Sequence, residues 1–225
     1  EWESSDIKKT LIILLNNADQ FNQKSSVIVW LFKKIAIFKH YLNRNTISTS
    51  KENIKQHYDL GNDFYKHFLD ETMLYSCAIY PNPTASLHEA QKEKLSQIIN
   101  KAHIKPEHHV LEIGSGWGAM AIELATKIGC KVTTITISEK QYQYTKALIE
   151  KHQLTHKITL LFQDYRSLKG QFDRIISIEM LEAVGHDYLP VFFNKINELL
   201  VSSGKAVIQS ITINDKGYEN YRKST

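Results

Sequence analysis

The sequence predicts an α/β domain in which a parallel sheet carries helices on both faces. Two observations lead to this class: strand-like and helix-like patterns alternate over residues 54–225, and a glycine-rich turn joins one short apolar strand to the helix after it. Such alternation is typical of β–α–β units. The elements expected in chain order are helix 86–103, strand 109–113, helix 120–128, strand 131–137, helix 139–152, strands 157–163 and 173–178, helix 190–200 and strand 205–213.

Composition is that of an ordinary globular chain and argues against disorder. Hydrophobic residues make up 42% and charged residues 23% of the 225 positions. The net charge of +4 favours contact with anionic surfaces without singling out nucleic acid, and we expect no nucleic-acid partner. Cys77 and Cys130 are the two cysteines, which fits a reducing cytoplasm better than a disulfide framework. We find no apolar run long enough to span a membrane, no signal peptide, and no metal-ligand spacing, so no metal is expected.

The first 53 residues are expected to form a basic helical segment and linker that precedes the domain of residues 54–225. One helix face carries apolar side chains, and the other carries basic ones: Ile28, Leu31, Ile35, Phe38 and Leu42 against Lys33, Lys34, His40 and Arg44. The apolar stripe could pack on the main domain, or the helix could lie on anionic lipid. The chain starts at Glu1 without Met and ends in a charged segment, which we interpret as a fragment whose C-terminal part is missing.

The glycine-rich turn is the strongest functional signal. It consists of Val110, Leu111, Glu112, Ile113, Gly114, Ser115, Gly116, Trp117 and Gly118. Glycines let the backbone turn tightly and approach a ligand, and the helix after them directs its N–H groups at that ligand. The Gly-x-Gly-x-Gly spacing differs from that of dinucleotide-binding turns. With an acid two residues before the first glycine, it favours S-adenosylmethionine (SAM) as the ligand, whose cation or amino acid end suits the Glu112 carboxylate.

Two further segments follow expected strands where a cofactor would contact them. After the second strand, Thr136, Ser138 and Gln141 could hydrogen-bond the ribose, although Ser138 could be only a helix N-cap. After the third strand, the Tyr165 ring and a backbone N–H could recognise adenine, although Tyr165 could also be a packing residue.

Several motifs in order resemble the cyclopropane fatty acid synthases and the related mycolic acid methyltransferases, which are class I SAM-dependent methyltransferases. Besides the glycine-rich turn they are His57-Tyr-Asp-Leu-Gly-Asn-Asp-Phe-Tyr65, Tyr75-Ser-Cys-Ala78, Thr136-Ile-Ser-Glu-Lys-Gln141, Gln163-Asp-Tyr165 and Ser177-Ile-Glu-Met-Leu-Glu-Ala-Val-Gly185. The resemblance runs from about Asn53 to Ile213, and the N-terminal helices resemble the end of the extra domain in longer bacterial members.

The resemblance implies a Rossmann-like SAM domain and a reaction. A methyl group from SAM is added to the cis double bond of a phospholipid acyl chain, and loss of a proton closes a cyclopropane. Beyond the glycine-rich turn, the SAM contacts that it implies are Tyr75, Ser76, Thr136, Ile137, Ser138, Glu139, Lys140, Gln141, Tyr165 and Arg166. It also implies a bound bicarbonate as base, held by Cys77, Glu182 and Ile211, with Gln209 nearby. The implied partner is membrane phospholipid at the inner face of the membrane, and a homodimer is left open.

The chain departs from the best-known members at two places. Gln209 replaces a His, and Leu181-Glu182-Ala183 replaces Phe-Glu-His; Gln can hydrogen-bond bicarbonate but cannot carry a proton. Glu179 and Glu182 are expected to share one helix face, with Glu179 on the helix surface, and Cys77 could be a small buried residue. The alternatives to cyclopropane formation are methylation of another hydrophobic or small-molecule acceptor and a non-catalytic, membrane-associated module that binds SAM or lipid.

Overall fold

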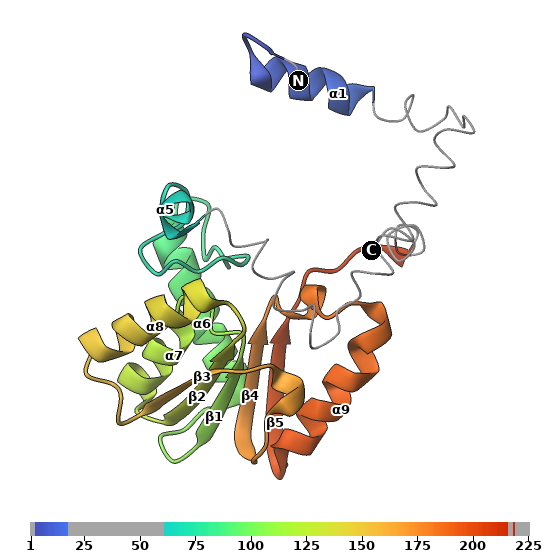
Figure 1. Cartoon of the computed structure of the whole chain (residues 1–225). Helices are drawn as coiled ribbons and strands as arrows, with labels where there is room; N and C mark the ends of the chain where they lie inside the picture. Colours follow the sequence, from blue (N-terminus) through green and yellow to red (C-terminus); the bar gives the residue numbers. More distant parts are fainter. Residues whose placement is uncertain (1–2, 18–60, 216–217, 219–225) are drawn as a thin grey trace. The chain divides into compact units, whose positions relative to one another are not determined.

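Within the residues that the structure describes (3–17, 61–215 and 218), the central element is a five-stranded parallel sheet (Figure 1). In this computed structural model the chain divides into two units, Glu1–Arg44 and Asn45–Thr225, and the sheet belongs to the second. The strands are β1 (His109–Ile113), β2 (Lys131–Thr136), β3 (Ile158–Phe162), β4 (Phe172–Ile178) and β5 (Leu200–Gln209), in the order β3-β2-β1-β4-β5. The parallel α/β class is therefore confirmed, and the strand order reverses between β1 and β4, where such sheets bind ligands.

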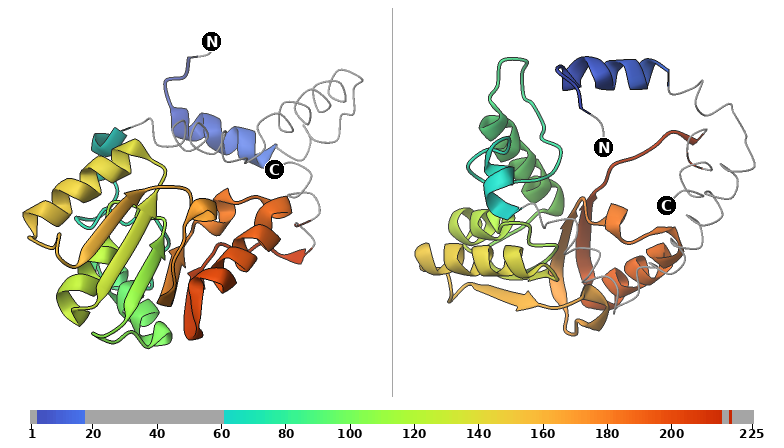
Figure 2. Two further views of the ribbon diagram at one scale, coloured as in Figure 1. Left: turned by 60° about the horizontal axis from the view of Figure 1, so that its bottom comes forward. Right: turned by 45° about the horizontal axis from the view of Figure 1, so that its top comes forward.

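Helices cover both faces of the sheet, as expected (Figure 2). One face carries α6 (Leu87–Ala102), α7 (Ala119–Glu123), its π-helical continuation Leu124–Ile128, and α8 (Glu139–Lys151). The other face carries α9 (Leu189–Leu199). Because side chains alternate along a strand, Val110 and Leu111 of β1 enter opposite cores, and both are completely buried.

The helix boundaries follow local capping signals. Ser86 and Glu89 form a capping box at the start of α6, and His103 ends the helix in the left-handed conformation. Leu95 and Ile98 of α6 are buried. The helix expected over 86–103 is confirmed to within one residue at each end.

The last strand differs from its prediction. β5 covers Leu200–Gln209, so it begins five residues before the expected 205–213 and ends before Ile213. Leu200 pairs with Phe172 and Lys205 with Arg174, so the register shifts by several residues in between. A Cβ at Gly204 would lie 2.9 Å from the Val201 carbonyl oxygen and 3.2 Å from that of Asp173, so the backbone of the bulge favours glycine there. The small polar residues of this bulge resemble a turn, so the sequence predicted a strand that begins only at residue 205.

The first unit contributes one described helix, α1 (Ile7–Asn16), whose N-cap is Asp6. Its large apolar side chains are exposed: Ile7, Leu11, Ile12, Ile13, Leu14 and Leu15. In the described parts of the chain, no helix has both the length and the apolar character needed to cross a membrane. The apolar stripe predicted over residues 28–42, and the basic residues beside it, lie outside the described residues.

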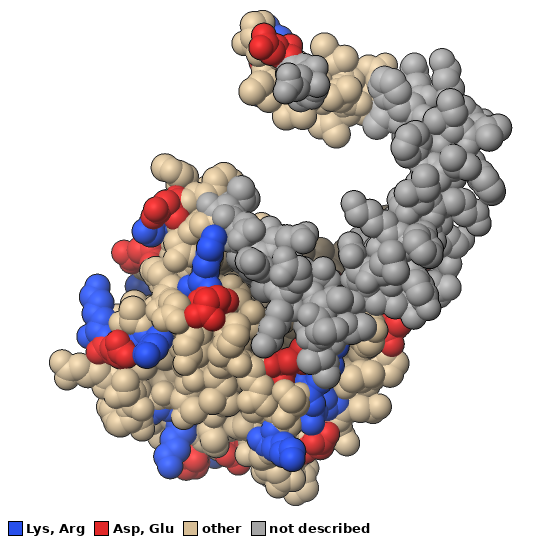
Figure 3. Space-filling model, in the orientation of Figure 1, with Lys and Arg blue, Asp and Glu red and all other residues tan. Residues whose placement is uncertain are grey.

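Charged side chains are mixed on the face of the second unit that Figure 3 shows. Lys and Arg side chains lie among Asp and Glu side chains over its described surface. On this face the described Lys and Arg side chains do not gather in one basic patch.

Candidate active site

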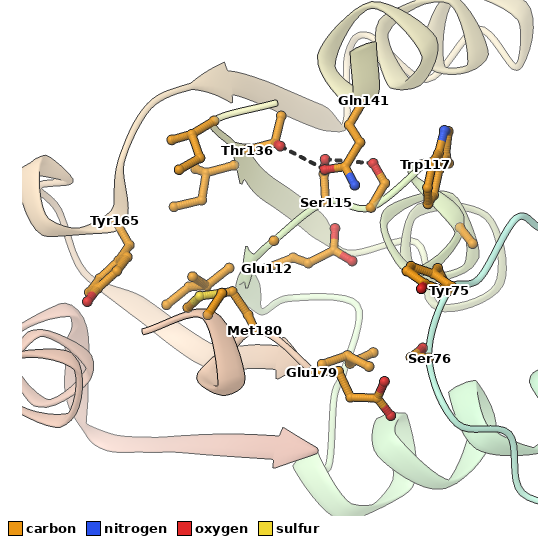
Figure 4. Close-up of a pocket in the computed structure, with 18 of the residues that line it drawn as sticks. Tyr75, Ser76, Glu112, Ser115, Trp117, Thr136, Gln141, Tyr165, Glu179 and Met180 are labelled. Atoms are coloured by element: carbon orange, nitrogen blue, oxygen red, sulfur yellow. Dashed lines mark hydrogen bonds between the residues drawn. The ribbon is translucent and has the colours of Figure 1, made fainter. Parts of the chain in front are cut away.

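A pocket opens at the carboxyl edge of the sheet (Figure 4). Its walls come from the ends of four strands and from the segment before α6. The lining residues include Glu112 to Gly116 at the end of β1 and after it, Ile135 to Ile137 at the end of β2, Gln163 to Arg166 after β3, Ile178 to Met180 at the end of β4, and Met73 to Ser76. Parallel sheets of this order bind ligands in this position.

The glycine-rich turn forms the floor of the pocket. Its glycines Gly114, Gly116 and Gly118 have φ of +96°, +49° and +92°, a region that side chains disfavour. The N–H groups of Gly114 and Ser115 both donate to the Ile135 carbonyl, at 3.1 and 2.9 Å, which ties the turn to β2. A Cβ at Gly118 would collide with Thr145, whereas one at Gly116 would enter open space. Gly116 is thus the residue that leaves this space for a ligand.

Glu112 places a buried carboxyl group in this pocket. The residue is only 4% exposed, and Thr134 on β2 donates a hydrogen bond to Oε2 over 2.5 Å. Burial raises the pKa of Glu112 to about 8, against the lowering effect of the Thr134 hydrogen bond. Desolvation disfavours the anion, so a cation bound beside it would favour the ionised form.

The loop after β2 is organised by hydrogen bonds between its own side chains. Thr136 accepts from the Ser138 N–H and donates to Gln141 Oε1 over 3.0 Å (Figure 4). Thr136, Ile137 and Gln141 line the pocket. Ser138 is the N-cap of α8 and accepts from the Gln141 N–H, which supports the N-cap alternative for this residue.

The turn after β3 contains an ion pair that sequence reasoning overlooked. Arg166 donates to both carboxylate oxygens of Asp164, at 2.9 and 2.6 Å, and this pairing raises the pKa of the guanidinium. Asp164 is 7% exposed and lines the pocket with Tyr165 and Arg166. Tyr165 also packs edge-on against Phe192, which supports the packing alternative, while its place in the lining leaves the contact with adenine a prediction. The one available signal for Asp164 was its position directly after the third strand.

An aromatic cluster adjoins the glycine-rich turn on the side of α5 (Gly61–Lys66). Trp117 Nε1 donates to Asn62 over 2.9 Å, and the Tyr65 ring lies 5.0 Å from Trp117 and 5.1 Å from Tyr75. Tyr75 and Ser76 line the pocket, as does Trp117. Asn62 belongs to one of the motifs that resemble the family, and its hydrogen bond with Trp117 supports the glycine-rich turn directly.

Two glutamates hold the residues that were predicted to act in catalysis. Glu179 Oε1 accepts from the Cys77 N–H at 2.8 Å and from Gln209 Nε2 at 2.9 Å. Glu182 Oε1 accepts from the Ile211 N–H and from Ser210 Oγ. The structure thus places Cys77 with Gln209 and Glu182 with Ile211. Glu179 lines the pocket, whereas in the described chain these four residues lie outside its lining.

Two expectations about these residues are wrong. Glu179 and Glu182 do not share a helix face, because Glu179 has a φ of +47° after β4 and Glu182 lies in the short 3₁₀ turn Leu181–Ala183. The alternative that Cys77 is a small buried residue also fails, since Cys77 is exposed.

Two buried polar residues of α6 were not singled out from the sequence. Lys94 is fully buried and its Nζ donates to Ser76 Oγ over 2.5 Å. Burial lowers the pKa of Lys94 to about 8, while Glu179 and Cys77 act in the opposite direction. Gln91 Nε2 donates to the carbonyls of Leu74 and Ser76. Both side chains hold the pocket segment that contains Ser76; the helical pattern gave no signal beyond their place on the inward side of α6.

The remaining predicted cofactor contacts do not border the pocket in the described structure. Val110 and Leu111 are core residues, and Gly118, Ser138, Glu139 and Lys140 lie outside the lining. Among the described residues, no three His, Cys, Asp or Glu side chains cluster as metal ligands would.

Comparison with known proteins gives a consistent result. The model of the family described as mycolic acid cyclopropane synthetase matches residues 45–225. The chain is 33% identical over 220 residues to the tuberculostearic acid methyltransferase UfaA1 of Mycobacterium tuberculosis, covering 95% of this chain and 51% of that protein. It is 39% identical over 157 residues to the cyclopropane-fatty-acyl-phospholipid synthase of Escherichia coli K12, covering 70% and 40%.

A solved structure shows the same fold. The mycolic acid cyclopropane synthase CmaA1, crystallised with SAH and CTAB, superposes with a TM-score of 0.68 at 30% identity. The match covers 70% of this chain and 55% of that one. The chain therefore spans about half the length of the relatives that it matches.

Proposed function

Because the chain belongs to the mycolic acid cyclopropane synthetase family, we propose that its protein transfers a one-carbon unit from SAM to unsaturated acyl chains. The observation that carries this proposal is the buried carboxyl of Glu112 beside a glycine-rich turn that leaves space at Gly116. A cationic cosubstrate with an amino acid end fits a pocket of this chemistry. The family resemblance of the turn, at the switch point of the sheet, supports SAM.

The proposed contacts follow from the lining of the pocket. Glu112 faces the charged part of SAM, and the turn approaches it closely at Gly116. In the proposed complex Gln141 and Thr136 contact the ribose and Tyr165 contacts the base, and all three residues line the pocket. Tyr75 and Ser76 close the pocket from the side of α6.

The proposed acceptor is the cis double bond of a membrane phospholipid chain, and the product is a cyclopropane fatty acid. The E. coli relative is named for a fatty-acyl-phospholipid product and the M. tuberculosis relative for a fatty acid. Next to the pocket, the ring of Phe68 contacts those of Phe64 and Tyr75, and each of the three is about half exposed. Apolar rings in this position suit a hydrocarbon chain.

The chemistry divides between cosubstrate and protein. SAM, when bound, supplies an electrophilic methyl group to the π electrons of the double bond. The chain has to exclude water, to stabilise positive charge on the acyl chain, and to accept a proton. Glu179 and Glu182, both in the segment after β4, supply the carboxylates for these tasks.

The cellular setting is proposed with the same reaction. A phospholipid acceptor places the protein at the inner face of the membrane, in the cytoplasm, as a peripheral protein. Mild net positive charge of +4 suits an anionic lipid surface.

The test is lipid mass spectrometry of cells that express the full-length protein. We expect monounsaturated phospholipids to gain one CH₂, and Gly116→Val to abolish this gain because a side chain enters the ligand space. Glu150→Gln, an exposed change on α8, is the matched control and should behave as wild type. If wild type adds no such mass to any lipid while it binds SAM, the protein is a SAM-binding module or acts on another acceptor.

A further inference from the structure

The residues that the family resemblance assigns to a bicarbonate do not fit one in this chain. The Cys77 N–H and both hydrogens of Gln209 Nε2 are engaged, by Glu179 and by the Cys77 carbonyl. The Ile211 N–H donates to Glu182. An added anion would find these donors occupied and two carboxylates beside it, and like charges at such range repel.

We propose that the Glu179 carboxylate is the proton acceptor of the reaction and takes the place of a separate bicarbonate. This inference rests on the proposed transfer to acyl chains. Sequence reasoning placed Glu179 on a helix surface, so the assignment comes from the contacts of the folded chain.

The carboxylate is held in a position that suits the task. Glu179 lies at the end of β4 and lines the same pocket as Glu112 and Ser76 (Figure 4). Oε1 accepts two hydrogen bonds, from the Cys77 N–H and from Gln209. Oε2 has no hydrogen-bond partner among the described residues. One oxygen therefore orients the group, and the other is available to receive a proton.

The backbone conformation of Glu179 indicates that its side chain is kept for a function. Glu179 has a φ of +47°, a conformation that costs a non-glycine residue roughly 1 kcal/mol. Glycine would relieve this strain, and strained residues persist where their side chains serve a site. The hydrogen bonds from Cys77 and Gln209 hold the strained residue in place.

Lys94 supplies the positive charge on the inner side of the same site. Its Nζ is buried against Ser76 Oγ, and the Glu179 charge counteracts the fall in the pKa of Lys94 that burial causes. A buried cation stabilises a carboxylate near it. Gln91, which binds the Ser76 carbonyl, fixes the segment between them.

The proposed step balances without another reactant. After methyl addition the acyl chain carries one positive charge at the neighbouring carbon. A C–H bond of the added methyl breaks, its electron pair forms the third C–C bond of the ring, and the proton passes to Glu179 Oε2. The acyl chain becomes neutral, and the Glu179 carboxylate becomes a carboxylic acid that later returns the proton to water.

The experiment compares the intact wild-type protein with Glu179→Gln and Glu179→Gly. Transfer from SAM to monounsaturated phospholipid vesicles is measured in CO₂-free buffer and with added bicarbonate. Binding of ¹³C-bicarbonate is measured separately by NMR line broadening. Glu179→Gln keeps an acceptor for Cys77, and Glu179→Gly removes the side chain where φ favours glycine, so both should fold. Glu150→Gln is the control for loss of a negative charge.

Wild type should turn over equally fast with and without bicarbonate and should not bind it. Glu179→Gln should be roughly a hundredfold slower, with its SAM affinity within about threefold of wild type. Glu179→Gly should be slow in CO₂-free buffer, should bind bicarbonate, and should recover at least tenfold when bicarbonate is added.

Three results would overturn the assignment: a wild type that needs bicarbonate, a wild type that binds it, or a Glu179→Gln variant as fast as wild type. If wild type binds SAM but transfers nothing to acyl chains, the proposed function fails instead. Comparing bicarbonate binding by wild type and Glu179→Gly then still decides whether the Glu179 carboxylate occupies the site of the bicarbonate.

Discussion

Glu112 makes SAM binding dependent on pH in a direction that the structure specifies. Its pKa is raised to about 8 because the group is buried, so below that pH the empty pocket holds mostly the neutral acid. The sulfonium of SAM favours the ionised acid, and binding should release a proton. SAM affinity should therefore rise with pH and level off above about 8.

The size of the effect follows from one unit of pH being worth about 1.4 kcal/mol. At pH 7 roughly a tenth of the Glu112 groups are ionised, so affinity should be about tenfold below its plateau, and at pH 6 about a hundredfold. Isothermal titration calorimetry between pH 6 and 8.5, in buffers of different ionisation enthalpy, measures both affinity and proton release. Glu112→Gln is the control and should bind more weakly, with little pH dependence over this range.

The same shift predicts the pH dependence of stability without ligand. A carboxyl whose pKa is raised on folding stabilises the protein fully below the ordinary value of 4.5 and loses that contribution as pH rises towards about 8. Bound SAM should reduce this loss. A SAM affinity that stays constant or falls from pH 6 to 8 would refute the role given to Glu112.

Three other changes test separate parts of the structure. Gly116→Val should weaken SAM binding by roughly tenfold or more in calorimetry, because a β-branched residue is strained at a φ of +49° and fills the ligand space; equal affinity would exclude this site. Ser86→Ala should lower the free energy of unfolding by about 1 kcal/mol in thermal denaturation, because it removes the capping box with Glu89. Glu182→Gln should keep SAM affinity within about threefold but slow turnover roughly a hundredfold, because it removes a charge that stabilises the acyl cation; an unchanged rate in the lipid assay would remove Glu182 from the mechanism.

The elements of the sheet could be predicted because their signals are local. The capping residues Ser86 and Ser138 mark helix starts, and the glycines after β1 mark the turn. β5 was misjudged because its bulge around Gly204 depends on pairing with β4, which local pattern does not reveal.

The site could be predicted only where its residues are close together in the sequence. Glu112 and Gly116 stand in one motif, whereas Glu179 depends on Cys77 and Gln209, which are 102 residues before it and 30 after it. Three-residue spacing suggested a helix for Glu179, and the turn after β4 overrode it. Lys94 gave no signal because its meaning depends on burial against Ser76.

The most direct test of the central claim is transfer from SAM that carries a trideuterated methyl group. The purified full-length protein is incubated with vesicles of monounsaturated phospholipid and, in parallel, of saturated phospholipid, and the acyl chains are analysed by mass spectrometry. If the account is right, only the unsaturated chains gain one carbon with two deuterons, since the third deuteron leaves as the ring closes. If the protein binds SAM but neither lipid gains mass, transfer to acyl chains is contradicted; if three deuterons remain, ring closure by loss from the added methyl is contradicted.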